Sequence, residues 1–303
     1  MNTLKLFIFY SISFLPHLAC ADFYDLLYSG VSIPKDVYFN FDPAADNKLI
    51  KARVPVFAVT GVVECKHYDL KNGNGICPPI PPSTTPYAIT PYPSGIEILG
   101  VGSGRVGDGQ PHGTPDKNPL LNVKEIKGEA PVAYWPGYVI SKEGITIGLT
   151  GFNTGGMQFT KLKPRVGPGP GPPPHPYDWG ELPGCVKLDT APCRPVSLLL
   201  DTGIDYSNVR LPLGTTWTNR DSITQKLKEP ADVGFVLGDP AVETIHFVVR
   251  HDLAIPADNE EPDYVHAYGR DGLGSFVNTG SHAYRILVVA FDAVLGRMGF
   301  KRV

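Results

Sequence analysis

The chain has few charged residues and no excess of either sign, and these shortages exclude several kinds of protein. Only 19% of its 303 residues are Asp, Glu, Lys or Arg, and the formal net charge is -3. Because nucleic acid is normally met by a strongly basic surface, this balance gives no support for a nucleic-acid partner. Beyond the N-terminus the chain lacks an apolar run long enough to cross a bilayer, so we expect no stable membrane insertion.

Several catalytic and metal-binding signatures are missing as well. The chain contains no Gly-x-Ser-x-Gly, no His-Glu-x-x-His and no Cys-x-x-Cys. Gly102–Gly107 has the spacing of a dinucleotide fingerprint, but that motif requires a following helix, and Pro111 stands soon after it. We therefore expect no cofactor and no metal. The acidic turn Asp258–Asp263 leaves calcium open, with a solvated loop as the simpler interpretation.

Glycine and proline, by contrast, are abundant. The chain has 33 Gly and 31 Pro, a composition that disfavours long helices and favours short strands joined by turns. The sequence therefore predicts an all-β fold, with one short helix around Leu120–Ile126 and an exposed Gly/Pro-rich loop at 164–176. The expected strands include 54–59, 138–140, 144–149, 196–200, 244–249 and 286–292, the last of which turns back as a hairpin.

The N-terminus resembles a secretory signal peptide. Lys5 precedes the apolar run Leu6–Tyr10, and the small residues Ala19–Ala21 follow, so we assign residues 1–21 to the signal and expect an extracellular or periplasmic protein. The remaining cysteines are even in number, as in a disulfide-bonded chain: Cys65, Cys77, Cys185 and Cys193. Local pairing of Cys65 with Cys77 and of Cys185 with Cys193 is the simplest of the three connectivities.

One apolar strand ends in a carboxylate. Val196–Leu200 is followed by Asp201, Thr202 and Gly203. A carboxylate at such a place is costly to bury without a partner, Gly203 permits a sharp turn, and Thr202 can hydrogen-bond across to a facing element. We take these three residues as the candidate catalytic residues. The simpler alternative is an ordinary turn that begins with Asp.

Together with other stretches, this motif resembles the pepsin-like aspartic peptidase superfamily. Leu198–Ile204 is similar to a catalytic loop of the second lobe, and Leu273–Phe276 to the apolar crossing that lies under such a loop. Val288–Phe300 resembles the closing hairpin of the family, and Gly95–Gly102 the corresponding crossing of a first lobe.

The resemblance implies a bilobal double barrel. It implies a partial N-terminal lobe at 22–150 and a C-terminal lobe at 151–303, with a boundary near Thr150. It also implies a peptide or protein substrate bound in a cleft between the lobes.

Two departures from the family pattern concern the chemistry. Ile204 stands where the family usually places Ser or Thr, so we expect one hydrogen bond fewer on Asp201. Asp201 also begins the only Asp-Thr-Gly in the chain. Hydrolysis needs one carboxylate as general base and one carboxylic acid to protonate the carbonyl oxygen. Since the resemblance shows no first-lobe loop, we expect either a truncated gene model or a degenerate protein. A homodimer could restore the pair, but the partial first lobe would obstruct it, so we expect a monomer.

These observations leave three functional hypotheses. The first is a secreted aspartic-peptidase-like protein with weak or no activity unless a second Asp is supplied. The second is a non-catalytic binding or inhibitor-type protein that keeps the fold. The third is a carbohydrate-active β protein, which would require a pair of carboxylates near a tryptophan such as Trp135, Trp179 or Trp217.

Overall fold

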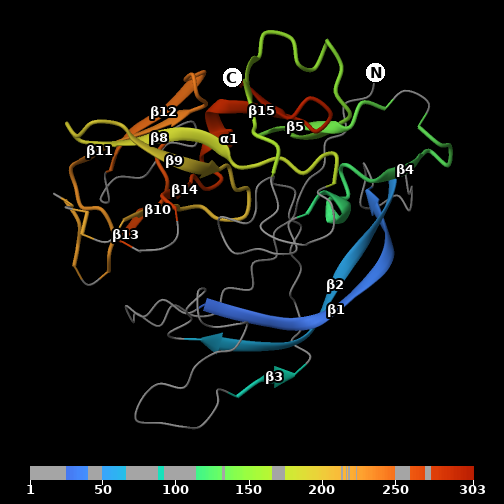
Figure 1. The fold of residues 1–303 in the computed structure, drawn as a ribbon, viewed down its shortest axis with the longest axis horizontal. Coiled ribbons are helices and arrows are strands. Elements are labelled where there is room, and N and C mark those ends of the chain that lie inside the picture. The colour runs from blue at the N-terminus through green and yellow to red at the C-terminus, as the bar shows by residue number, and fades with distance from the viewer. Residues whose placement is uncertain are drawn as a thin grey trace.

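The computed structural model describes residues 25–39, 50–65, 88–91, 114–131, 134–165, 175–212, 214–215, 217, 219–222, 224–249, 260–269 and 274–303, without the side chains of 25–32, 57 and 63–65. Within these ranges the helical segments are one 3-10 turn and one helix of four residues. The predicted all-β fold class is confirmed (Figure 1). The candidate signal peptide, Cys77, and the glycine-bearing stretch 95–107 lie outside the described residues.

A long antiparallel ribbon forms the N-terminal part of the described chain. Its sheet contains β1 (Asp25–Phe39), β2 (Ile50–Cys65), β3 (Thr90–Pro91) and β4 (Val123–Ile126). In β2, Ile50, Ala52 and Val54 are buried, whereas the alternate residues Lys51 and Arg53 are more exposed. This period of two is that of a strand with one face on the core. In Figure 1 the ribbon runs below the other sheets.

The second sheet has seven strands, in the order β12-β11-β8-β9-β14-β10-β13. Their bounds are β8 (Leu182–Leu188), β9 (Arg194–Leu199), β10 (Ser207–Leu211), β11 (Ala231–Leu237), β12 (Glu243–Val249), β13 (Val265–Gly269) and β14 (Phe276–Asn278). β14 pairs parallel with β9, and β10 pairs parallel with β13, while the remaining pairs are antiparallel. β9 is therefore a central strand, and the chain runs from its end through Leu200 to Asp201.

The third sheet has five strands, in the order β6-β5-β15-β16-β7. Their bounds are β5 (Gly137–Ser141), β6 (Gly144–Ile147), β7 (Gln158–Lys161), β15 (Leu287–Asp292) and β16 (Arg297–Arg302), and the short helix α1 (Ala283–Ile286) leads into β15. The predicted C-terminal hairpin is thus confirmed as β15 and β16. The strands on either side of Thr150 belong to this one sheet, and the lobe boundary at that point stays a prediction.

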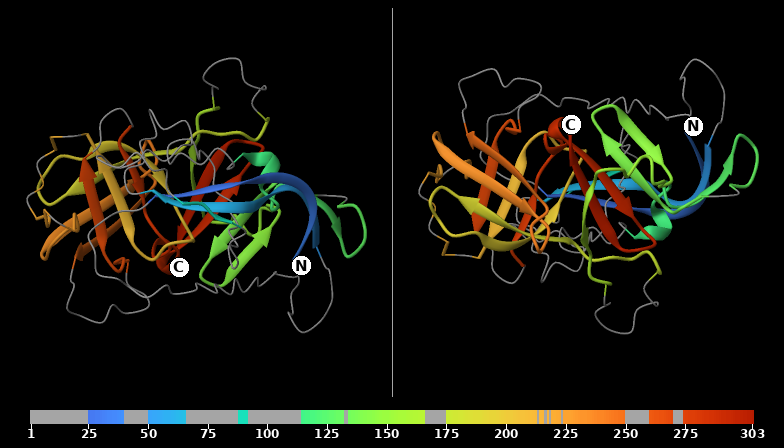
Figure 2. Two further views of the ribbon diagram at one scale, coloured as in Figure 1. Left: turned by 90° about the horizontal axis from the view of Figure 1, so that it is seen from below. Right: turned by 90° about the horizontal axis from the view of Figure 1, so that it is seen from above.

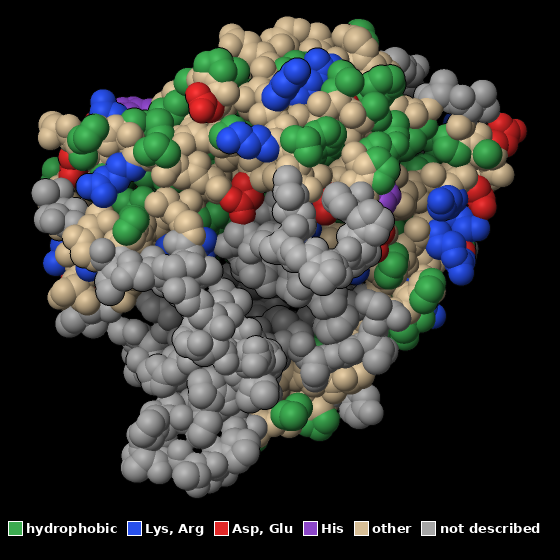
Figure 3. All heavy atoms as spheres, in the orientation of Figure 1, with side chains coloured by type: hydrophobic (Ala, Val, Ile, Leu, Met, Phe, Trp, Pro, Cys, Tyr) green, Lys and Arg blue, Asp and Glu red, His purple; other side chains and the backbone are tan. Residues whose placement is uncertain are grey.

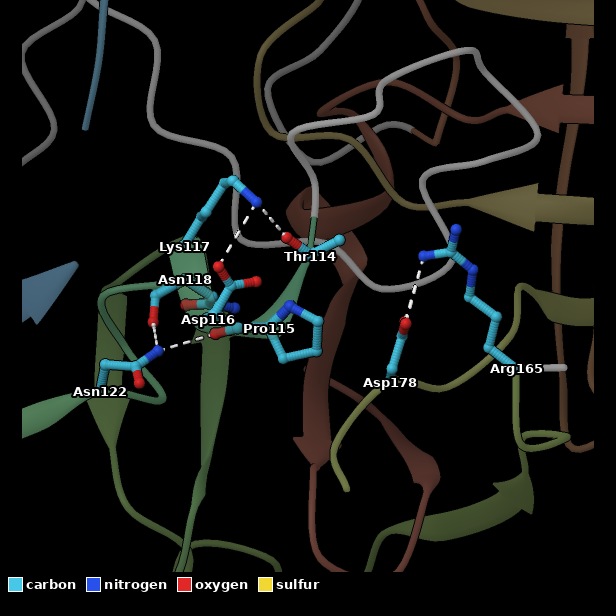
Figure 4. Close-up of polar contacts among 8 residues, drawn as sticks. All are labelled: Thr114, Pro115, Asp116, Lys117, Asn118, Asn122, Arg165 and Asp178. Atoms are coloured by element: carbon cyan, nitrogen blue, oxygen red, sulfur yellow. Dashed lines mark hydrogen bonds and ion pairs between the residues drawn. The ribbon is translucent and has the colours of Figure 1, made fainter. Parts of the chain in front are cut away.

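The predicted helix at Leu120–Ile126 is wrong. A 3-10 turn (Pro115–Lys117) stands before it, and residues 123–126 form β4. Asn122 explains the difference, because its side-chain amide donates to the carbonyls of Pro115 (2.7 Å) and Asn118 (2.8 Å) and closes a compact turn (Figure 4). Local side-chain bonds of this kind compete with helix formation.

The Gly/Pro-rich segment predicted at 164–176 is described only at its two ends. There Pro164 bridges to Trp179, and the Arg165 guanidinium lies 3.2 Å from the Asp178 carboxylate (Figure 4). A backbone bridge and an ion pair therefore join the two chain segments that flank the loop. What lies between them is outside the described residues.

One hydrophobic core joins the seven-stranded and five-stranded sheets, which lie side by side in Figure 2. Phe235 from the first and Phe300 and Leu287 from the second are almost completely buried in it. Each such side chain contributes roughly 1.5–3 kcal/mol of transfer free energy. On the face drawn in Figure 3, the described basic side chains are spread among acidic and apolar ones.

Candidate functional site

Asp201 lies two residues beyond the end of the central strand β9, after Leu200, and is half-buried. Its Oδ1 accepts a hydrogen bond from the backbone N–H of Gly203, at 2.7 Å. A Cβ at position 203 would lie 3.1 Å from that same oxygen, so glycine gives the turn room to close. Thr202 is half-buried within the turn, and Gly203 is exposed. The carboxylate is therefore oriented by its own turn.

The second oxygen of Asp201 is held from a neighbouring strand. β14 runs parallel to β9, with Asn278 opposite Leu199, and the Asn278 side-chain Nδ2 donates to Asp201 Oδ2 at 2.8 Å. Asn278 Oδ1 accepts from the backbone N–H of Gly280 at 3.0 Å. Since a backbone N–H can only donate, this bond fixes the amide with its nitrogen toward Asp201. Both carboxylate oxygens thus accept a hydrogen bond from a neutral donor.

The turn that follows Asn278 packs closely on the Asp201 loop. Ser281 N–H donates to the Ile204 carbonyl at 2.7 Å, and Thr279 N–H to the Leu199 carbonyl at 2.9 Å. Gly280 has φ +76°, and a Cβ there would lie 2.4 Å from the Tyr206 carbonyl oxygen. Glycine is required at this position by both its conformation and the close approach. The two loops therefore form one rigid unit.

Asn278 was missed by the sequence reasoning. Ile204 has no hydroxyl to offer the carboxylate, which led us to expect one hydrogen bond fewer on Asp201. The structure supplies a donor from Asn278 instead. The available signal was an amide side chain two residues after the end of the predicted crossing Leu273–Phe276, where it can reach the end of a parallel neighbour.

A second pair of acidic residues lies next to this loop. The backbone N–H of Asp263 donates to the Asp205 carbonyl at 3.1 Å. Burial, and then the neighbouring Asp205 carboxylate, raises the pKa of Asp263. Tyr206 and Tyr264 stack beside the pair with ring centroids 4.7 Å apart, and burial raises the pKa of Tyr264 to about 12. These two carboxyl groups interact with each other rather than with Asp201.

The other sequence-predicted residues are scattered. Cys185 and Cys193 form the predicted disulfide. Cys77 and the side chain of Cys65 lie outside the described residues, so their pairing stays a prediction. Among the described residues no group of three or more His, Cys, Asp or Glu is arranged to hold a metal ion, and no helix is long and apolar enough to span a membrane.

The tryptophans and histidines occupy different environments. Trp135 and Trp179 donate their indole N–H groups to Asp292 and to the Ala293 carbonyl, whereas the Trp217 ring lies 5.3 Å from the Arg220 guanidinium. His282 is fully buried, and its ring meets Phe247 edge-on. Burial, and then the Arg285 cation, lowers the pKa of His282 to about 3.

Comparison with known proteins finds a likeness among solved structures and none among family models or curated sequences. No protein-family model matches the chain, and no curated protein sequence matches it. Among solved structures, the aspartic proteinase from Irpex lacteus is similar over 91% of this chain and 83% of that protein, with 11% sequence identity and a TM-score of 0.38. A likeness at this TM-score gives no support for shared activity. Function is therefore argued from the site itself.

Proposed function

We propose that this chain is a secreted aspartic-peptidase-like protein whose Asp201 loop binds a peptide. The observation that supports the proposal is the fixed carboxylate, which Gly203 holds from one side and Asn278 from the other. A carboxylate has about four lone-pair sites, so two remain for a peptide N–H or a water molecule. The rigid packing of the 278–281 turn keeps these sites in place before a ligand arrives, which lowers the cost of binding.

In a hydrolytic reaction, Asp201 would act as the general base that takes a proton from water. A second group must then protonate the carbonyl oxygen of the peptide. Within the described residues, the partners of Asp201 are both hydrogen-bond donors of neutral groups, and neither is a carboxyl. The described chain therefore offers half of a catalytic pair, and we propose peptide binding with weak or no turnover.

A non-catalytic binding or inhibitor-type role is the second candidate, and Asn278 favours it. In a catalytic pair, two carboxyl groups share one proton between their facing oxygens. Here Asp201 Oδ2 faces an amide N–H that cannot be shared in this way. The Cys185–Cys193 disulfide supports export for either role, because disulfides persist mainly in oxidising compartments. We propose a monomer with a peptide or protein partner.

The test combines binding and turnover in the full chain. A peptide containing a statine residue, which mimics the hydrated carbonyl of peptide hydrolysis, is titrated calorimetrically, and cleavage of a mixed peptide library is followed from pH 3 to 7. We expect Asp201→Asn to weaken peptide binding by about tenfold, the loss of one charge-assisted contact. Asp239→Asn, at an exposed turn after β11, is the matched control and should bind as the parent chain does.

The outcomes separate the two roles. Cleavage by the parent chain that disappears in Asp201→Asn establishes a peptidase. Binding without cleavage establishes the non-catalytic role. Binding that is equal in the parent chain and in Asp201→Asn overturns the assignment of the site.

A further inference from the structure

The five-stranded sheet has one face on the core and one face directed away from it. Phe291 and Phe300 lie on the core face. Because side chains alternate along a strand, Asp292 of β15 and its partner Arg297 of β16 lie on the opposite face, here called the outer face. Lys301, four residues after Arg297 on β16, shares that face. In Figure 1 this sheet lies at the top, where β5 and β15 are labelled, and the β1–β2 ribbon lies below it.

The segment 148–157 crosses the outer face. It connects β6 with β7, and these two strands are the opposite edges of the sheet. A Cβ at Gly137 of β5 would lie 2.8 Å from the Leu149 side chain, and a Cβ at Gly156 would lie 3.8 Å from Lys301 Nζ. Gly137 and Lys301 both belong to the outer face by the pairing of their strands. The segment therefore begins over β5 and ends over β16.

Phe152 stands in this segment and is 84% exposed. The turn that carries it is ordered by its own hydrogen bonds. The Asn153 side chain accepts from the Thr150 N–H at 2.8 Å and donates to the Gly148 carbonyl at 2.9 Å. Thr154 Oγ1 donates to the Thr150 carbonyl at 2.7 Å. A preformed turn that exposes a large apolar side chain lowers the ordering cost of inserting that side chain into a partner.

Two further exposed apolar side chains lie at one end of the outer face. Asp292 is almost completely buried, and its Oδ1 accepts from the Trp135 indole N–H at 3.0 Å and from the Leu295 backbone N–H at 3.1 Å. Trp135 and Leu295 are nevertheless 44% and 48% exposed. Because the Trp135 N–H already has its acceptor, the exposed part of the ring can enter an apolar layer without losing a hydrogen bond to water.

The exposed charges on the strands of the outer face are cationic. Lys161 of β7 pairs with Arg297 of β16, and Lys301 lies roughly 13 Å from Arg297 at about 3.3 Å per residue. Lys161 and Lys301 are exposed. Among the described strand residues of this face the one acidic side chain is Asp292, which is buried and accepts from Arg297 Nε at 2.9 Å. An anionic surface would therefore meet cations and no exposed carboxylate on these strands.

This combination of side chains favours a lipid surface over a protein partner. Lysine is depleted in the interfaces between proteins. Lys and Arg beside exposed aromatic side chains are typical of proteins that lie on an anionic bilayer, where long cationic side chains stay at the phosphates while apolar ones enter the acyl boundary. Both kinds of side chain are present on the outer face.

We propose that the outer face binds peripherally to an anionic lipid surface. Phe152 and Trp135 enter the acyl boundary, and Lys161, Arg297 and Lys301 lie at the lipid phosphates. This binding needs no membrane-spanning segment. It goes beyond the peptide binding proposed for Asp201 and does not depend on it.

The test is co-sedimentation of the full chain with vesicles of phosphatidylcholine that contain about one third phosphatidylserine, compared with vesicles of pure phosphatidylcholine. We expect binding to the anionic vesicles to be at least about tenfold tighter, since three cations contribute. It should weaken by at least about fivefold between roughly 0.1 M and 1 M salt, because salt screens the charges. Parent and variant chains share the same N-terminus, so any contribution of its apolar run is common to all of them.

Two variants separate the apolar contribution from the cationic one. Phe152→Ala should weaken binding by about tenfold, because a large apolar side chain no longer enters the acyl boundary. The double variant Lys161→Gln and Lys301→Gln should weaken it by about 25-fold, or about fivefold for each charge. Arg297 is left unchanged, because its loss would leave the buried Asp292 without a cation.

Two controls change the same kinds of side chain elsewhere. Ile89 is 62% exposed beside β3, and Lys35 is exposed on β1, so both belong to the ribbon sheet and not to the outer face. Ile89→Ala and Lys35→Gln should bind as the parent chain does. Far-UV circular dichroism checks that every variant is folded.

The outcomes are distinct. Weaker binding by Phe152→Ala and by the double lysine variant, but not by the two controls, supports the proposal. Equal binding by the parent chain and by these folded variants overturns it, as does equal binding to anionic and neutral vesicles. Capture of the chain by immobilised polyglutamate without binding to vesicles would identify an acidic polypeptide as the partner, and would also overturn it.

Discussion

The two ends of β9 are rigid for different reasons. At the Asp201 end, the loops are joined by hydrogen bonds from Gly203, Asn278 and Ser281. At the other end, in the β8–β9 turn, a disulfide and the paired bonds between Asp189 and Asp232 hold the chain. Hydrogen bonds alone join the loops at the first end, whereas a covalent bond also closes the turn at the second. One strand therefore connects a loop held by hydrogen bonds to a turn whose stability depends on redox conditions.

Acidification should destabilise the Asp201 end of β9 first, and this is the largest change in the free energy of unfolding that we expect. His282 directly follows the 278–281 turn, and its burial lowers the pKa to about 3. The unfolded chain takes up this proton near pH 6.5 while the folded chain stays neutral, so stability is fully present above pH 6.5 and is lost as the pH falls toward 3. Between pH 7 and pH 4 the loss is about 3 kcal/mol.

The measurement is the free energy of unfolding in urea at pH 7, 5.5 and 4. His282→Leu cannot take up the proton, and its stability should fall less steeply over the same range. Among the described side chains the His282 ring nitrogens have no hydrogen-bond partner, so the leucine variant should also be no less stable at pH 7. Equal pH dependence in the two chains would show that another group is responsible.

Breaking the disulfide should affect the other end. The double variant Cys185→Ser and Cys193→Ser opens a loop with a sequence separation of 8 and should lower the free energy of unfolding by about 2.5 kcal/mol. Hydrogen exchange should accelerate in residues 186–192 and stay slow in 278–281. Equal acceleration in both segments would mean that the two ends of β9 unfold as one unit.

Replacing Asn278 tests a single contact at the Asp201 end of β9, the hydrogen bond from Asn278 to Asp201. Asn278→Asp places a carboxylate against Asp201 Oδ2, where the present contact is 2.8 Å, and should cost about 2 kcal/mol at pH 7.5. The repulsion raises the folded-state pKa of the pair, so this penalty is present at high pH and disappears as the pair gains a proton on acidification.

Asn278→Leu serves as the matched variant, because it removes the same hydrogen bond without adding a charge. Its loss of stability relative to the parent chain should not depend on the ionisation of a second carboxylate. The measurement is the melting temperature of the aspartate variant and of the leucine variant, each at pH 7.5 and at pH 5. If the aspartate variant shows no gain relative to the leucine variant at pH 5, the two side chains do not face each other in solution.

The sequence was informative where a pattern is local. The alternation and composition of segments such as 138–140 and 286–292 predicted strands that the structure confirms, and the short spacing of Cys185 and Cys193 predicted their bond. The helix expected at Leu120–Ile126 was wrong because apolar spacing there competes with the turn that Asn122 closes. Side-chain to backbone bonds of this kind leave no periodic signal.

The site itself could be predicted only in part. Asp201 stood out because a carboxylate follows an apolar strand. Asn278 did not, because its role depends on the parallel pairing of β14 with β9, across 77 residues of chain. Long-range register decides this arrangement.

The five-stranded sheet has a consequence for how the protein is made. β5 pairs with β15, whose residues follow it by about 150 positions, and β7 pairs with β16. During synthesis, the β5–β6 pair and β7 have unpaired strand edges until β15 and β16 (residues 287–302) emerge from the ribosome. Contacts so distant in the chain fold slowly, and open strand edges attract other nascent chains. High-level expression should therefore depend on a chaperone that shields these edges during the wait.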